Sequence, residues 1–268
     1  MTKKFRPSQQ PIKLDGKIML AMELHRQHTA PPRRARYQAP GHMASLALPD
    51  LLDFVQRAAL DPKQLNLLSS PRDDGAATIH YAGDLAALTP PSISIVGTRD
   101  VSDEGRRRAR RLSRELVEAG VTVVSGLAKG VDTAALTAAL EAGGRTAAVI
   151  GTPLDKAYPA ENARLQEQIY AEHLLLTPFA IGEPTFKGNF PKRNRVMAAV
   201  SDASVIVEAS DTSGTLHQAA ECGRLGRWLF IMRSVAEDRS LSWPAKFIDK
   251  PKVAVISSTQ DVLDAIRK

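Results

Sequence analysis

The chain has 268 residues, a net charge of +7, 43% hydrophobic residues and only 5% aromatic residues. The scarcity of aromatic residues favours a core of Val, Ile, Leu and Ala, which is typical of an α/β protein rather than a β-sandwich. Its apolar runs are too short for a membrane-spanning helix, and no secretory signal follows the basic N-terminus. The single Cys222 excludes an intramolecular disulfide and a multi-cysteine zinc site. We therefore expect a cytoplasmic protein with no membrane association and no metal.

The positive charge is concentrated at the N-terminus. Residues 1–48 contain nine Lys or Arg and two acidic residues, so this arm holds the whole excess and the remaining chain is neutral. A basic arm on a neutral body either neutralises phosphates or serves as a solubilising tail, and the sequence leaves both open. Within it, TAPPRRARYQAPG at 29–41 predicts a flexible or extended connector. Residues 1–48 are thus predicted to be a basic, partly flexible arm.

Residues 49–92 predict a small helical subdomain followed by a linker. Pro49-Asp50 is a helix start within ASLALPDLLDFVQRAAL. A polar stretch, LLSSPRDDGAAT, then leads to the short apolar run IHYAG and to the linker DLAALTPP. This segment would form a small helical extension of the domain that follows.

From residue 93 to 268, apolar runs alternate with helical patterns. The predicted strands are SISIVG (92–97), VTVVSG (121–126), RTAAVIG (145–151), LLLTPF (174–179), ASVIVEA (203–209), RWLFIM (227–232) and VAVISS (253–258). The predicted helices span 102–120, 131–144, 161–173, 192–202, 215–226 and 259–268.

Continuous runs of Val, Ile and Ala indicate a parallel sheet that is covered on both faces. Several of the intervening helices end in Gly, as helices of such folds commonly do. The fold class is therefore α/β, a Rossmann-like, doubly wound, mostly parallel sheet with a small helical N-terminal extension.

Three consecutive strands end in glycine followed by small or polar residues. They are IVGTR, VVSGLAKG and AVIGTP, with Arg99 and Lys129 among the neighbouring side chains. Ligands of open parallel sheets bind at the carboxyl ends of the strands, where backbone N–H groups at helix starts suit a phosphate. Each motif alone is explained by a plain turn, but three in succession favour an anionic ligand.

Two nucleotide-binding fingerprints are absent. No GxGxxG follows the first strand and no acidic residue ends the second, which disfavours an NAD dehydrogenase. No GxxxxGK[ST] is present, which disfavours ATP hydrolysis. No cofactor is expected.

Four motifs between residues 78 and about 232 together resemble the DprA (Smf) family of DNA-processing proteins. They are IVGTR, SGLAKGVDTAAL, AVIGTPLDKAYPAEN and NFPKRNRVMAAVSDASVIVEASDTSGTLHQAAECGR. The resemblance implies an extended Rossmann fold that binds single-stranded DNA without catalysis. It further implies a homodimer and, in transformable bacteria, a RecA-like recombinase as partner.

The resemblance also implies a set of DNA- or phosphate-binding residues. These are Gly97, Thr98, Arg99, Ser125, Gly126, Lys129, Gly130, Lys156, Tyr158, Asn162, Phe190, Arg193, Asn194, Arg195, Ser213, Gly214 and Thr215. No catalytic residue is implied.

The chemistry of these residues agrees with this assignment. Arginines at strand ends and helix starts, with N–H groups beside them, would track phosphates, and Tyr158 and Phe190 are candidates to stack on bases. Arg193 and Arg195 flank a helix start, where cations are unfavourable unless an anion or a partner offsets them.

The chain departs from the family pattern in several places. Leu136 stands where the family usually has His, and Met232-Arg233-Ser234 replaces a proline-glycine pair. A C-terminal winged helix, common in longer members, is not expected here, and the basic arm is not a recognised family feature. We interpret the chain as a divergent member.

Three alternatives stay open beside this interpretation. One is an antitoxin or regulatory partner of a toxic enzyme in a toxin–antitoxin or antiphage defence system, and another is a module that senses free nucleotides. The third is a nucleotide phosphoribohydrolase that uses Glu208 and Glu221. It is disfavoured because DTSGTLHQAAE keeps only the GT of the PGGxGTxxE signature.

Overall fold

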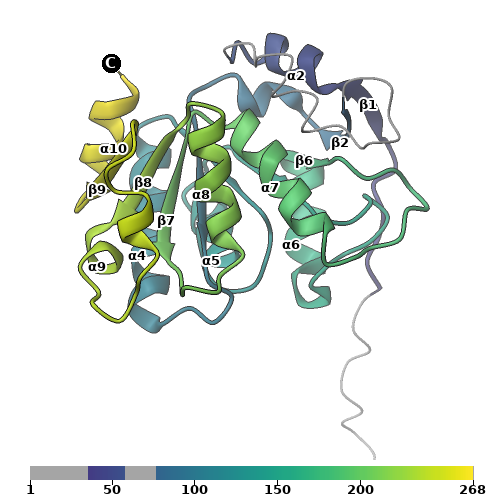
Figure 1. Ribbon diagram of the computed structural model, residues 1–268. Helices are drawn as coiled ribbons and strands as arrows, with labels where there is room; N and C mark the ends of the chain where they lie inside the picture. Colours follow the sequence, from purple (N-terminus) through teal and green to yellow (C-terminus); the bar gives the residue numbers. More distant parts are fainter. Residues whose placement is uncertain (1–35, 58–76, 268) are drawn as a thin grey trace, which may run out of the picture. The chain divides into compact units, whose positions relative to one another are not determined.

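The computed structural model describes residues 36–57 and 77–267, which form one nine-stranded sheet flanked by helices (Figure 1). The strand order is β1-β2-β6-β5-β4-β3-β7-β8-β9. The strands are β1 (Ala44–Ala47), β2 (Thr78–Gly83), β3 (Ser92–Gly97), β4 (Thr122–Ser125), β5 (Thr146–Val149), β6 (Leu174–Thr177), β7 (Ala203–Glu208), β8 (Trp228–Met232) and β9 (Val253–Ile256).

The sheet is doubly wound, as the sequence predicts. Strands β3 to β9 pair in parallel, with β4, β5 and β6 on one side of β3 and β7, β8 and β9 on the other. The direction of winding therefore reverses between β3 and β7. Ligands of such sheets bind at the carboxyl ends of the strands beside this reversal.

The helices fall close to the predicted positions. They are α2 (Leu48–Phe54), α4 (Asp103–Glu118), α5 (Val131–Glu141), α6 (Ala163–Glu172), α7 (Asn189–Val200), α8 (Thr215–Arg224), α9 (Arg233–Ala236) and α10 (Thr259–Ile266). Short 3₁₀ helices are η1 (Leu85–Leu88), η2 (Ala160–Asn162) and η3 (Pro244–Lys246). The sequence pattern does not predict α9 and η3, because each is only three or four residues long. No helix in the described ranges is long and apolar enough to cross a bilayer.

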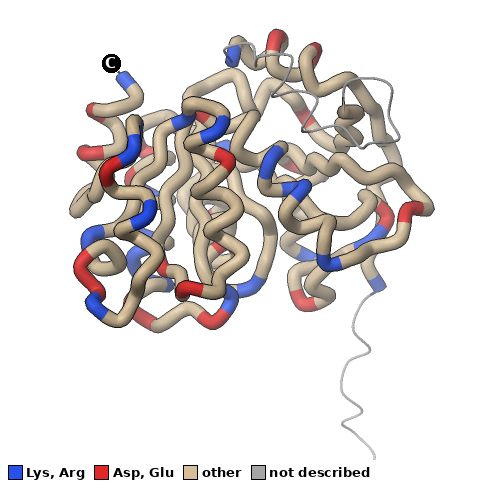
Figure 2. The backbone as a smooth tube through the Cα atoms, in the orientation of Figure 1, with Lys and Arg blue, Asp and Glu red and all other residues tan. Residues whose placement is uncertain are grey.

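Helix α4 illustrates why the helical pattern is readable in the sequence. The Ser102 side chain caps it by accepting a hydrogen bond from the Gly105 N–H at 2.9 Å. Buried Ala109, Leu112 and Leu116 recur at helical spacing, whereas most of its arginines face solvent. Figure 2 shows Lys and Arg interspersed with Asp and Glu along the described chain. On α4, Arg107 and Arg108 pair with Glu104 and Arg111 lies 4.0 Å from Glu115, so these arginines are accompanied by acidic side chains.

The N-terminal part of the described chain differs from the prediction of a purely helical extension. Strand β1 pairs antiparallel with β2, and β2 pairs antiparallel with β6, so the sheet extends across the expected boundary at residue 48. Helix α2 does include the predicted Pro49 in its first turn. The sequence pattern misses the strands because β1 has only four residues and both are stabilised by pairing with strands distant in the chain. Most of the basic arm, residues 1–35, lies outside the described residues.

The end of the predicted connector is fixed to the body of the domain. The Tyr37 hydroxyl donates to the Leu154 carbonyl and accepts from the Gln166 amide, each at 2.8 Å. The Tyr170 hydroxyl donates to the Gln38 carbonyl at 2.8 Å. Residues 37 and 38 therefore belong to the folded unit.

A buried arginine lies at the amino-terminal ends of strands β3 and β7. Arg57 is only 7% exposed. Its guanidinium donates to the carbonyl oxygens of Val55, Leu88 and Pro90, to Ser92 Oγ and to the Asp202 carboxylate, at 2.7–3.0 Å. This clamp joins the end of α2 to η1, β3 and the turn before β7.

Cys222 is a small buried residue. Its thiol donates to Ser204 Oγ, which also accepts from the Gln218 amide. Burial raises the pKa of the Cys222 thiol to about 12, so it stays protonated and unreactive at neutral pH.

Candidate functional site

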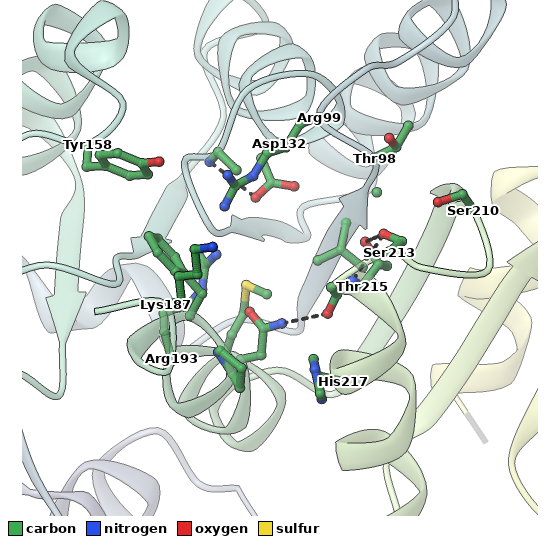
Figure 3. A pocket seen from close by; sticks show the side chains of 18 residues that line it. Thr98, Arg99, Asp132, Tyr158, Lys187, Arg193, Ser210, Ser213, Thr215 and His217 are labelled. Atoms are coloured by element: carbon green, nitrogen blue, oxygen red, sulfur yellow. Dashed lines mark hydrogen bonds between the residues drawn. The ribbon is translucent and has the colours of Figure 1, made fainter. Parts of the chain in front are cut away.

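A cavity of about 500 Å³ lies at the carboxyl ends of β3 and β7, where the winding reverses (Figure 3). Segments from β3, α5, α7 and α8 surround it. Its lining consists of Val96, Gly97, Thr98, Arg99, Ala128, Asp132, Tyr158, Lys187, Phe190, Pro191, Arg193, Asn194, Met197, Ser210, Ser213, Gly214, Thr215 and His217. This volume is within the range of small-molecule sites.

Arg99 is presented by the end of β3. The strand's last residue, Gly97, is followed by Thr98, whose N–H donates to the Glu208 carbonyl at 2.7 Å and so continues the pairing with β7. Arg99 therefore follows the last hydrogen bond between β3 and β7, and its side chain is exposed. Its guanidinium carbon lies 5.3 Å from the centroid of the Phe190 ring, within the range of a cation–π contact.

Arg193 reaches the same cavity from α7 but is only 5% exposed. Its guanidinium donates to the Gly126 carbonyl and, at 2.7 Å, to the Val149 carbonyl. A Cβ atom at position 126 would overlap that guanidinium, so glycine is required there for close approach. Gly126 thus serves the protein's own arginine, in addition to any role toward a ligand.

Asp132, in the first turn of α5, partly offsets this charge. Its carboxylate accepts from the N–H groups of Gly126 at 3.1 Å and Ala128 at 3.3 Å, and therefore braces the loop after β4. Burial raises the pKa of Asp132, and the nearby Arg193 opposes that rise. Lys187, Arg99 and Arg193 outnumber this single carboxylate among the described lining residues, so the cavity suits an anion.

The starts of α7 and α8 reinforce the preference for anions. Both helices have glycine at the N-cap, Gly188 and Gly214, without a side-chain cap. The positive end of each helix dipole favours negative charge, and the Asn189 and Thr215 N–H groups there bind only neutral oxygens, the Phe186 carbonyl and Ser213 Oγ. By contrast, the start of α4 already binds a carboxylate, because Glu208 accepts from the Ser102 N–H at 3.0 Å and hydroxyl at 2.6 Å.

Twelve of the predicted site residues lie at this end of the sheet around neighbouring cavities. The main cavity is lined by Gly97, Thr98, Arg99, Tyr158, Phe190, Arg193, Asn194, Ser213, Gly214 and Thr215. Gly126 and Lys129 line a smaller adjoining one, which shares Arg99, Tyr158, Phe190 and Arg193. Within it, the Lys129 ammonium lies 2.7 Å from the Glu161 carboxylate.

The other five predicted residues, Ser125, Gly130, Lys156, Asn162 and Arg195, do not line these cavities. The buried Asn162 amide donates to the Leu127 carbonyl and to Thr133 Oγ1, each at 2.9 Å, which makes it a brace. Ser125 donates to the Ile95 carbonyl at 2.6 Å. Motif membership does not separate such braces from ligand contacts, because both occur in the same loops.

Arg195 and the two candidate catalytic glutamates are engaged elsewhere. Arg195 Nε lies 3.2 Å from Glu221, which also accepts from Arg224 Nε at 2.6 Å. Glu208 caps α4. Neither glutamate is among the described residues that line the main cavity, so no carboxylate pair faces it. Among the described residues, no group of three or more His, Cys, Asp and Glu is arranged to hold a metal ion.

The two predicted base-stacking aromatics contact each other. The Tyr158 and Phe190 ring centroids are 5.4 Å apart at an interplanar angle of 44°. Phe190 also packs so tightly on Gly151 that a Cβ there would lie 2.8 Å from the ring. Since Arg99 lies over the same ring, Phe190 supports the arginine, whereas Tyr158 is 48% exposed.

Lys187 is a lining residue that the sequence reasoning missed (Figure 3). It lies two residues before the start of α7. The signal that singled out Arg193, a cation near a helix start, could have found it.

Comparison with known proteins shows which family this chain is similar to. The family model for DNA recombination-mediator protein A matches residues 60–267. The DNA processing protein DprA of Streptococcus pneumoniae is 38% identical over 190 residues, which cover 71% of this chain and 67% of the relative. Protein Smf of Synechocystis is 45% identical over 142 residues, and the aligned part spans 36% of its length and 53% of this chain.

Solved structures agree. The crystal structure of the S. pneumoniae DprA superposes with a TM-score of 0.67 at 32% identity, covering 92% of this chain and 81% of that one. A DprA structure from Helicobacter pylori, described for its single-stranded DNA binding mode, gives 0.65 at 25% identity, covering 88% and 98%. Because the family model spans most of the chain and these relatives share its sheet, the chain belongs to the DNA recombination-mediator protein A (DprA/Smf) family.

Proposed function

We propose that the protein binds single-stranded DNA, holding backbone phosphates in the carboxyl-end cavity, and acts as a non-enzymatic mediator of recombination. The observation that supports this most directly is the excess of cations, Arg99, Lys187 and Arg193 against Asp132, around a cavity of about 500 Å³. Protein contacts to phosphates come mainly from such side chains and from N–H groups at helix starts. The binding mode described for the H. pylori relative supports a strand over other anions.

A binding role is favoured over catalysis by the arrangement of the carboxylates. A glycoside hydrolase would need two acidic groups facing the scissile bond, but Glu208 and Glu221 are held by Ser102 and by arginines. The expected homodimer and recombinase partner stay predictions. The toxin-partner alternative gains no support from the described residues.

The first test measures anisotropy of a labelled single-stranded oligonucleotide with the wild type and Arg99→Ala. We expect Arg99→Ala to weaken binding about tenfold or more, because it removes a charged contact to phosphate. The slope of log K against log salt concentration should fall by about 0.7, the value for one phosphate contact on a single strand. Arg111→Ala is the matched control, because Arg111 is an exposed arginine on α4 with a long 4.0 Å ion pair to Glu115.

Absence of binding at low salt would overturn the proposal. If a nucleoside monophosphate competed as well as an oligonucleotide of equal nucleotide concentration, the cavity would be a nucleotide sensor instead. An equal loss in Arg99→Ala and Arg111→Ala would indicate diffuse attraction rather than a site.

A further inference from the structure

Phe186 is the most exposed large apolar side chain in the described ranges. It is 65% exposed, and Ile181, five residues earlier, is 58% exposed. Both lie in the loop 178–188 that connects β6 to α7 (Figure 1). Exposed single apolar residues are common on protein surfaces, so exposure by itself assigns no role. The position and surroundings of Phe186 are what distinguish it.

The loop that presents Phe186 is held by its own hydrogen bonds. The Ala180 N–H donates to the Glu183 carboxylate at 2.7 Å, and the Glu183 N–H returns to the Ala180 carbonyl at 3.1 Å. Lys156 Nζ donates to the Glu183 carbonyl at 3.0 Å and ties the loop to the segment before η2. The Asn189 N–H donates to the Phe186 carbonyl at 3.0 Å, which ties the backbone of Phe186 to the first residue of α7.

This place adjoins the cavity. Lys187, the next residue, lines it, and so does Phe190, one helical turn further on (Figure 3). The Phe190 ring already contacts Gly151, Tyr158 and Arg99, as described above. Phe186 is not itself among the lining residues, so it offers an exposed aromatic ring at the rim of the cavity, next in sequence to a lysine that lines it.

The chemistry of the rim matches a nucleic-acid strand better than a protein surface. Phe186 is followed in sequence by Lys187, and the first turn of α7 carries the exposed Lys192. Alternation of an aromatic face with cations is the pattern by which proteins hold bases and phosphates of single strands. A stable protein interface needs about 800 Å² on each partner. Along this loop only Ile181 and Phe186 are exposed large apolar side chains among the described residues, which is too little apolar surface for a stable protein interface.

We propose that Phe186 is a base-stacking position for the strand whose phosphates occupy the cavity, an inference that rests on the proposed function. A base next to the phosphate at Lys187 would stack on the Phe186 ring. Phe190 would meanwhile hold Arg99 toward the backbone. The loop 178–188 thus extends the site beyond the residues implied by the family motifs.

The test compares two polymers of equal length and charge, an oligothymidylate and an abasic oligonucleotide that lacks every base. Phe186→Ala should weaken binding of the oligothymidylate about fivefold or more, as expected for loss of one stacked base, and leave binding of the abasic strand unchanged. Phe54→Ala is the matched control, since Phe54 is 51% exposed at the end of α2 and lines no part of the cavity. It should change neither affinity.

A tryptophan variant tests the stacking at position 186 by a second, independent measurement. Phe186→Trp should retain the affinity for oligothymidylate, and its added fluorescence should be quenched by that strand but not by the abasic one. Phe54→Trp should show no quenching.

Other results would overturn the inference. Unchanged oligothymidylate binding by Phe186→Ala, or an equal loss on both polymers, would exclude stacking at this residue while leaving phosphate binding intact. If Phe186→Ala instead dissociated a dimer, as measured by light scattering, the loop would be a contact between copies. Failure of the wild type to bind either polymer would remove the proposed function itself, and Phe186 with it.

Discussion

The two ends of the sheet each contain a buried arginine, and the two are used differently. At the amino-terminal edge Arg57 meets three carbonyl oxygens, a hydroxyl and the Asp202 carboxylate at 3.0 Å. At the carboxyl ends Arg193 meets two carbonyl oxygens, and Asp132, whose charge acts on it, accepts from two backbone N–H groups. The charge of Arg57 is therefore paired with a carboxylate inside the protein, whereas the hydrogen bonds of Arg193 go to neutral carbonyl oxygens and leave its positive charge available to a ligand.

The difference shows that a buried arginine can either stabilise the fold or contribute positive charge to a binding site. Desolvation lowers the pKa of both arginines, so each is tolerated only where acceptors surround it. Around Arg193 the protein adds further cations, Arg99 and Lys187, instead of more acceptors. Unbalanced charge of this kind is expected where a ligand completes the set.

The largest effect on this comparison should come from Arg57→Met. Removing the guanidinium leaves Asp202 with only the Ser92 N–H and several carbonyls without this donor, so we expect a loss of about 3 kcal/mol in the free energy of unfolding. Urea denaturation measures it, and the DNA affinity of the folded protein should be unchanged. Arg107→Met, an exposed arginine paired with Glu104, should cost less than about 1 kcal/mol. A weaker DNA affinity in Arg57→Met would show that the two ends of the sheet are coupled.

Gly126→Ala should affect both stability and binding. The new methyl group would overlap the Arg193 guanidinium, and overpacking of this kind costs about 1–3 kcal/mol. DNA affinity should fall as well, because Arg193 must move. Gly223→Ala is the control, since a Cβ there meets nothing within 4 Å and alanine favours a helix. Unaltered binding in Gly126→Ala would mean that the position of Arg193 is unimportant for DNA.

The smallest effect should come from Phe190→Leu. The variant keeps an apolar side chain but removes the ring beneath Arg99, a contact worth about 0.5–1 kcal/mol at an exposed site. We expect DNA binding to weaken by about two- to fivefold without any change in its salt dependence, because every charge remains. Phe54→Leu serves as the reference for an exposed phenylalanine outside the site. A reduced salt slope in Phe190→Leu would instead mean that Arg99 had lost its phosphate contact altogether.

Much of this protein was determined by local sequence patterns. The continuous apolar runs from Ser92 onward, separated by amphipathic helices such as Asp103–Glu118, specify a doubly wound sheet because each strand must be covered on both faces. The assignment of Arg99 and the segment 213–215 to one site came instead from the family resemblance, and the structure brings them together because the ends of β3 and β7 are neighbours. Strands β1 and β2 escape prediction because their stability comes from pairing with each other and with β6, far away in the chain.

What only the tertiary structure decided is the use of each side chain. Sequence motifs contain Asn162, Arg193 and Phe190 alike, but folding buries Asn162 as a brace, fixes Arg193 above Gly126 and places Phe190 under Arg99. Lys187 and Phe186 acquire their positions from a loop whose path depends on hydrogen bonds to Lys156 and Asn189. Charge, packing and exposure at a site depend on residues distant in sequence, and local patterns contain no measure of those distances.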